Sequence, residues 1–161
     1  MAITKLSLED FSSDDYDLIA IHSNLEDYRL AYFVNKYCGI SLEKAQRTID
    51  VNTPKGLSHF SLFTFDDQEN EYYWSLISNK SSVTETLENS PSLFADSALD
   101  IATNVYLIPE LKSVDYFLKI DETEGTLSLD SIFRKLANIK QISTVYEVES
   151  DTLRSKNNLI F

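Results

Sequence analysis

The sequence predicts an α+β fold with a mixed, mostly antiparallel sheet and two helices on one face, ferredoxin-like or ACT-like with an elaborated middle. Three observations support this prediction. Apolar residues recur at helical spacing in residues 25–38 and 129–137, each helix stands between two short extended segments, and two further extended runs, 59–65 and 72–78, flank a short polar link. The alternative is an open α/β sheet with helices on both faces.

The first predicted unit is strand, helix and strand. Residues 17–22 form a short apolar strand, and Ser23 followed by Glu26 has the spacing of a capping box. The helix then buries one face, made of Leu30, Phe33, Val34, Tyr37 and Cys38. Gly39 can adopt the left-handed conformation that ends a helix, and the next extended segment begins at Ile40.

The middle of the chain contains the predicted hairpin and less regular segments. Residues 52–58 include Pro54 and Gly56 and predict a loop. After the hairpin, residues 79–91 are rich in Ser and Thr and also predict a loop. Residues 93–102 fit either one short helix or irregular cover.

A second unit of strand, helix and strand follows a proline. Pro109 fixes its own φ and favours extended geometry at Ile108, so an arriving strand ends there and a new one runs over 114–120. Alternation assigns one face of that strand to the core, with Val114, Tyr116, Leu118 and Ile120. The other face carries Asp115, Phe117 and Lys119, whose charges predict exposure or pairing.

The second helix has clear start signals. Ser128 is the expected N-cap, and Leu127 with Ile132 occupies the two positions of a hydrophobic staple. Residues 143–149 form the closing strand. With right-handed crossovers, the two units place both helices on the same side of one sheet.

Six residues of this region carry a family resemblance: Ile108, Pro109, Glu110, Val114, Asp115 and Tyr116. With three residues between its halves, this pattern resembles the signature of the bacterial IPExxxVDY family. Residues 25–32 and 155–161 also resemble the family, so the resemblance spans nearly the whole chain. Residues 81–103 do not match and are interpreted as a variable insertion. The family has no assigned activity, so the resemblance implies no reaction.

Length and composition narrow the class of protein. The 161 residues suit a single domain, 1–161, with a substantial core. Fourteen basic against 26 acidic residues give a net charge of −12, which argues against nucleic acid or an anionic membrane as partner. The one cysteine, Cys38, excludes an internal disulfide and is expected to be buried. The N-terminal residues lack the apolar core of a signal peptide, and no apolar run reaches the roughly 20 residues of a membrane helix, so we expect a cytoplasmic protein.

Cofactor signatures are missing from the sequence. With three glycines it has no phosphate loop or dinucleotide pattern, and it has no paired cysteines and no nucleophile elbow, so we expect no cofactor and no metal. His22 lies four residues before Glu26, but nothing in the spacing fixes a third metal ligand, and we interpret it as a hydrogen-bonded strand end. His59 next to a loop carries no signal.

The candidate functional or structural residues are the six motif positions with Glu26, Tyr28 and Arg29. Glu110 in a cleft is suited to act as acid, base or ligand, but its position after a proline favours accepting hydrogen bonds from the amides of Lys112 and Ser113. Glu26 suits the positive end of the helix dipole. Arg29 either pairs locally or forms a fork onto Glu110.

Three functions are open on the sequence. The first is a non-enzymatic interaction or regulatory module, which forms a homodimer or binds a protein partner through a sheet edge or an uncovered sheet face. The second is an ACT-like domain that senses a small molecule, on fold analogy. The third is an enzyme that uses Glu110 with Arg29 or His22. The apolar residues 159–161 either pack back onto the domain or dock on a partner.

Overall fold

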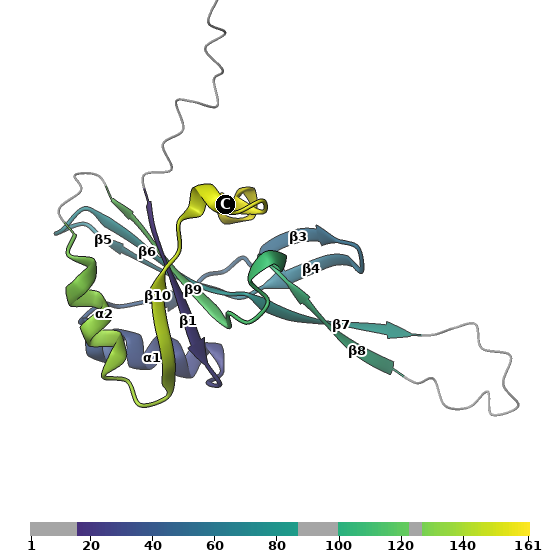
Figure 1. Ribbon diagram of the computed structural model, residues 1–161, viewed down its shortest axis with the longest axis horizontal. Coiled ribbons are helices and arrows are strands. Elements are labelled where there is room, and N and C mark those ends of the chain that lie inside the picture. Colours follow the sequence, from purple (N-terminus) through teal and green to yellow (C-terminus); the bar gives the residue numbers. More distant parts are fainter. Residues whose placement is uncertain (1–15, 87–99, 123–126) are drawn as a thin grey trace, which may run out of the picture.

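The computed structural model describes residues 16–86, 100–122 and 127–161 (Figure 1). Six strands form one sheet in the order β10-β1-β9-β6-β5-β2, and each neighbouring pair is antiparallel. The strands of this sheet are β1 (Tyr16–Ser23), β2 (Glu43–Lys44), β5 (Leu62–Asp67), β6 (Tyr72–Ser78), β9 (Tyr116–Glu122) and β10 (Ile142–Glu147). The helices are α1 (Asp27–Cys38) and α2 (Leu129–Ala137).

Two separate two-stranded ribbons complete the fold. One pairs β3 (Ile49–Thr53) with β4 (Gly56–Phe60), and the other pairs β7 (Lys80–Thr86) with β8 (Asp100–Tyr106). The β7–β8 ribbon projects away from the sheet (Figure 1).

The topology confirms the predicted α+β class. Strand β1 lies between β9 and β10, so β9, α2 and β10 form a split β-α-β unit, and β6 pairs with the other side of β9. Together with α1 after β1, this is the ferredoxin-like arrangement. The middle is elaborated by β2, β5 and the two ribbons. The predicted hairpin is β5 paired with β6.

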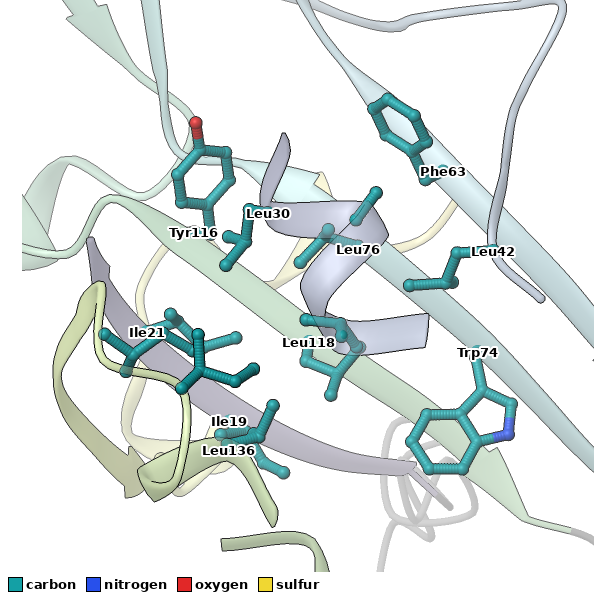
Figure 2. Packing of buried hydrophobic residues seen from close by; sticks show 14 of the residues in the cluster. Ile19, Ile21, Leu30, Leu42, Phe63, Trp74, Leu76, Tyr116, Leu118 and Leu136 are labelled. Atoms are coloured by element: carbon teal, nitrogen blue, oxygen red, sulfur yellow. The ribbon is translucent and has the colours of Figure 1, made fainter. Parts of the chain in front are cut away.

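Both helices cover the same face of the sheet. Leu30 of α1 and Leu136 of α2 are fully buried against this face (Figure 2). The residues that they cover come from alternate positions of the central strands and include Ile19, Ile21, Leu76, Tyr116, Leu118 and Ile120. The predicted core face of strand β9 is therefore confirmed from Tyr116 onward.

The opposite face of the sheet is also covered. Its buried residues include Leu18, Ala20, Ile77 and Phe117, and they pack against Ile49 and Phe60 of the β3–β4 ribbon and against Leu153 and Leu159 near the C-terminus. The burial of Leu159 agrees with the expectation that the last residues pack back, whereas Ile160 is 66% exposed. The face that carried Phe117 is thus a second core layer.

Lys119 is paired and buried within this second layer. Its Nζ lies 3.2 Å from Asp121 Oδ1, and the residue is only 8% exposed. The ammonium also lies 4.6 Å from the ring centre of Tyr16 and 5.1 Å from that of Phe161. The sequence predicted either exposure or pairing for this lysine, and the structure shows pairing. Two aromatic rings contact the ammonium where water would otherwise solvate it.

Five local predictions need correction. The loops expected over 79–91 and 52–58 include strands β7, β3 and β4, and β8 begins at residue 100 within the range expected to be a helix or irregular cover; residues 87–99 lie outside the described residues. The capping box is wrong. Ser23 is the last residue of β1, where its Oγ donates to the Gln141 carbonyl, and α1 begins two residues later than expected, at Asp27.

Candidate functional site

The motif residues lie between the end of β8 and the start of β9, where the β7–β8 ribbon meets the sheet (Figure 1). Pro109 opens a short 3-10 helix, Pro109–Leu111, at a position where a missing N–H costs nothing. Ile108 before it is extended, at φ −116° and ψ 90°, as proline requires. Ile108 and Val114 are fully buried, so these two motif residues anchor the turn in the second core layer.

The centre of this region is Asn79, a fully buried residue that sequence reasoning missed. Its Nδ2 donates to the carbonyls of Leu111 (2.8 Å) and Val114 (2.9 Å), and its Oδ1 accepts from the Ile108 N–H (2.9 Å). Its backbone N–H donates to the Asp115 carbonyl. The available signal was a single asparagine directly after the apolar strand 72–78. We call residues 107–116 and the groups that they contact through these bonds the motif junction.

Asp115 connects the motif junction to two other segments. Its Oδ2 accepts from the Ser23 N–H at the end of β1 (2.9 Å), and its Oδ1 lies 2.5 Å from Nζ of Lys80 at the start of β7. The Lys80 side chain is 39% exposed, so water weakens this ion pair, which contributes about 0–1 kcal/mol. The more important effect of Asp115 is geometric, because it joins the start of the ribbon to β1.

Tyr116 connects the motif junction to the segment before α1. Its hydroxyl donates to the Leu25 carbonyl at 2.6 Å. Burial, together with the negative charges of nearby acids such as Asp27, raises the pKa of Tyr116 to about 12. The phenol is therefore neutral at physiological pH and acts as a hydrogen-bond donor.

Glu110 connects the motif junction to the C-terminal segment. Its Oε1 accepts from the Ser155 N–H (2.7 Å) and its Oε2 from the Ser155 hydroxyl (3.0 Å). Partial burial alone would raise the pKa of Glu110, but these hydrogen bonds outweigh it and hold the pKa below its ordinary value. The partners expected from the sequence, the amides of Lys112 and Ser113, are replaced by Ser155. Asn158 adds a second link, from its Nδ2 to the Leu107 carbonyl (2.8 Å).

The three candidate residues at the start of α1 lie outside these contacts. Glu26 is the helix N-cap, Tyr28 is 59% exposed and Arg29 is also exposed. A hydrogen bond to Glu26 raises the pKa of the Tyr28 hydroxyl. Both Glu110 oxygens are engaged by Ser155, so the fork from Arg29 that the sequence allowed is not what holds Glu110.

The two histidines have local partners. His22 Nε2 lies 3.3 Å from the Tyr146 hydroxyl, with ring centres 5.6 Å apart, and His59 Nδ1 lies 2.6 Å from Asp50 Oδ1. No group of three histidine, cysteine or carboxylate side chains in the described ranges could hold a metal ion. In the same ranges, no helix has the length and apolar character needed to span a membrane.

A depression of about 620 Å³ opens beside the motif junction. Its lining is polar: Ser23, Asn24, Asp115, Lys140, Gln141 and Ser143. Both oxygens of Asp115 already accept from Ser23 and Lys80, so the one carboxylate in this lining is satisfied within the protein.

No family model, curated protein or solved structure matches the chain. Hydrogen bonds nevertheless bring together three segments that are far apart in the sequence, 25–32, 108–116 and 155–161. Tyr116 of the motif binds Leu25, in the block 25–32, and Glu110 binds Ser155, in the block 155–161. The three blocks therefore meet at the motif junction through hydrogen bonds.

Proposed function

We propose that this chain is a non-enzymatic interaction module that self-associates through the free edge of β10. We also propose that it is a cytoplasmic member of the IPExxxVDY family, whose motif braces the fold. Support for a bracing role comes from the six motif residues, each of which is buried, begins the turn or bonds a distant segment. The observation that carries the self-association is the open edge of β10.

Within the described sheet, β10 pairs only with β1. The Val148 N–H donates to the Leu18 carbonyl (2.8 Å), and the regular register runs from the pair Ile19–Glu147 to the pair His22–Thr144. Because antiparallel ladders alternate, the N–H and C=O groups of Val145 and Glu147 point outward from the sheet. None of the described residues is seen to bond these groups, which makes them a template for another strand.

The opposite edge of the sheet is a poorer template. Strand β2 has only two residues, Glu43 and Lys44, and both are charged and exposed. Short, charged edge strands resist pairing with other chains. The asymmetry between the two edges singles out β10.

A second copy fits the β10 edge in a defined register. A twofold axis through Val145 pairs this residue with its own copy and sets Ser143 opposite Glu147 of the second molecule. No like charges then face each other across the new ladder, which would be destabilising. Val145 is half-buried and packs on the helix-side core, so pairing covers the rest of its side chain.

The test is the molecular mass in solution by light scattering, with two variants of one residue. The wild type is expected at twice the 18.4 kDa monomer mass. Val145→Pro removes an outward N–H without touching a bond to β1, and should give a monomer, whereas Val145→Thr keeps the N–H and should remain dimeric. A monomeric wild type, or a Val145→Pro variant that stays dimeric, contradicts the proposal.

The enzymatic alternative has less support. A general acid or base needs a carboxylate free to reach its substrate. Both oxygens of Glu110 are instead used to hold Ser155, and His22 is engaged with Tyr146.

A further inference from the structure

One flank of α2 runs along the open edge of the sheet. Helix α2 packs chiefly on β10 and on α1. Its flank toward α1 is marked by Ser131 and Lys135, which line a pocket together with the residues that end α1. At 3.6 residues per turn, Leu129, Phe133 and Ala137 lie on the other flank. Because β10 is the outermost strand, that flank faces the edge of the sheet.

The fold covers this flank only in part. Leu129 and Phe133 are half-buried and pack on the helix-side core, and Ala137 is exposed. Val145 of β10 is also half-buried against the same core. We call Leu129, Phe133, Ala137 and Val145 the edge strip. Sheet edges that stay unpaired are normally protected by charged side chains, whereas apolar ones lie beside the open groups of β10.

Phe133 is level with the twofold axis proposed through Val145. The Ile142 N–H donates to the Ile139 carbonyl, so the chain reverses there and β10 runs antiparallel to α2. From Ile142 to Val145 the strand advances about 10 Å. The same distance back along the helix takes about seven residues and ends close to Phe133. The axis therefore brings Phe133 to its own copy.

The spacing of the two helices fits direct packing. When two copies of β10 pair antiparallel with equivalent faces on the same side, the axis is perpendicular to the sheet and both α2 helices lie on one side. Leu136 packs in one cluster with Ile19 of β1 and Val145 of β10, so α2 lies over the gap between these strands. The middle of that gap is about 5 Å from the axis, which sets the two helices about 10 Å apart. Helices in contact are roughly 8–10 Å apart.

We propose that α2 packs antiparallel on α2 of a second copy through the edge strip. Phe133 meets its own copy, and Leu129 lies opposite Ala137 of the second copy. At the exposed rim, Asp130 and Arg134 have opposite charges, and the antiparallel order brings each near the other's copy. The contact rests on the proposed pairing of β10. It adds selectivity, because main-chain bonds accept any strand and side chains choose a second copy of this chain.

The experiment measures the dissociation constant of the dimer of the full chain by sedimentation equilibrium. Ala137→Glu should raise this constant at least about tenfold, because its carboxylate would face Leu129 and Asp130 of the second copy. The matched control is Ala102→Glu, at an exposed alanine of the β7–β8 ribbon, which should change the constant by no more than about twofold. Both alanines are exposed, so neither substitution disturbs the core.

A second variant tests the centre of the edge strip. Phe133→Ala should raise the dissociation constant about tenfold or more, since aromatic residues at the centre of an interface contribute most to affinity. Because Phe133 also packs on its own core, urea unfolding of the variant checks that its monomer is folded at the concentrations used.

The outcomes distinguish this contact from the pairing of β10. A monomeric wild type, or a Val145→Pro variant that stays dimeric, refutes the pairing and the helix contact together. If Val145→Pro dissociates the dimer while Ala137→Glu and Phe133→Ala bind as tightly as wild type, the pairing stands and the helix contact is overturned. Equal weakening by Ala137→Glu and Ala102→Glu also overturns the helix contact.

Discussion

Replacing Asn79 with alanine tests whether the motif junction holds the fold together. The substitution leaves the Ile108 N–H and the Val114 carbonyl buried without their partner, and it also frees the Leu111 carbonyl, which water can reach more easily. Each orphaned buried group costs about 1–3 kcal/mol, so the two buried groups together cost about 2–6 kcal/mol. Small domains have only about 5–15 kcal/mol of unfolding free energy, so this is a large loss.

Urea unfolding followed by circular dichroism measures this loss. With a urea m-value of about 1–3 kcal/mol/M, the unfolding midpoint of Asn79→Ala should fall by about 0.7 M or more. The control is Asn138→Ala, an exposed asparagine after α2, which should change stability by no more than about 0.5 kcal/mol. Asn79→Asp should destabilise at least as much as alanine, because its carboxylate would face two carbonyl oxygens. A loss under about 1 kcal/mol for Asn79→Ala refutes the reasoning.

Two further predictions concern the other links of the motif junction. Glu110→Gln should cost under about 1 kcal/mol at neutral pH. The fold lowers the pKa of Glu110, so the stabilisation by its carboxylate is present above the unfolded pKa of 4.5 and is lost as pH falls through the folded pKa. The stabilities of wild type and variant should therefore converge in acid. A difference in urea midpoint that stays constant between neutral and acid pH contradicts this. Tyr116→Phe should cost about 0.5–1.5 kcal/mol. The fold raises the Tyr116 pKa from 10 to about 12, so the contribution of the hydroxyl to stability is complete below pH 10 and is lost between pH 10 and about 12. If the urea midpoints of wild type and Tyr116→Phe differ equally across that range, the hydroxyl hydrogen bond is not the cause of the difference.

Elements with one buried face were predictable from sequence. Helix α2 has the expected bounds, 129–137, because its apolar residues recur at helical spacing and its entry carries polar and apolar signals. Strand β9 is buried on both faces and was located instead by its β-branched and aromatic residues, and the hairpin by two extended runs around a polar link. Neither signal requires knowledge of the partner.

The β7–β8 ribbon shows where this reasoning stops. Residues 80–84 are half-buried or exposed and none is buried, so no buried face imposes an apolar period, and the Ser- and Thr-rich segment reads as a loop. Burial of Lys119 was hidden for a different reason. Its cover includes Phe161, and the sequence says nothing about which distant residue will close over a given face.

The motif junction was located by sequence but not explained by it. The six motif letters marked the right place, yet the partners of Glu110 and Asn79 lie 45 and 29–35 residues away along the chain. Hydrogen bonds over such separations leave no periodic trace. A lone buried asparagine is recognised only when its neighbours in space are known.

The arrangement around Asn79 also has a use in engineering. The backbone of this residue binds both the Leu107 N–H and the Asp115 carbonyl, so the two chain ends that emerge toward the β7–β8 ribbon are tied at its base. A segment inserted in the ribbon beyond these two hydrogen bonds leaves the register of β6 and β9 in the sheet unchanged. An epitope or reporter displayed there would stand clear of the helical layer and of β10, which makes the ribbon a natural attachment point for probes of the intact molecule (Figure 1).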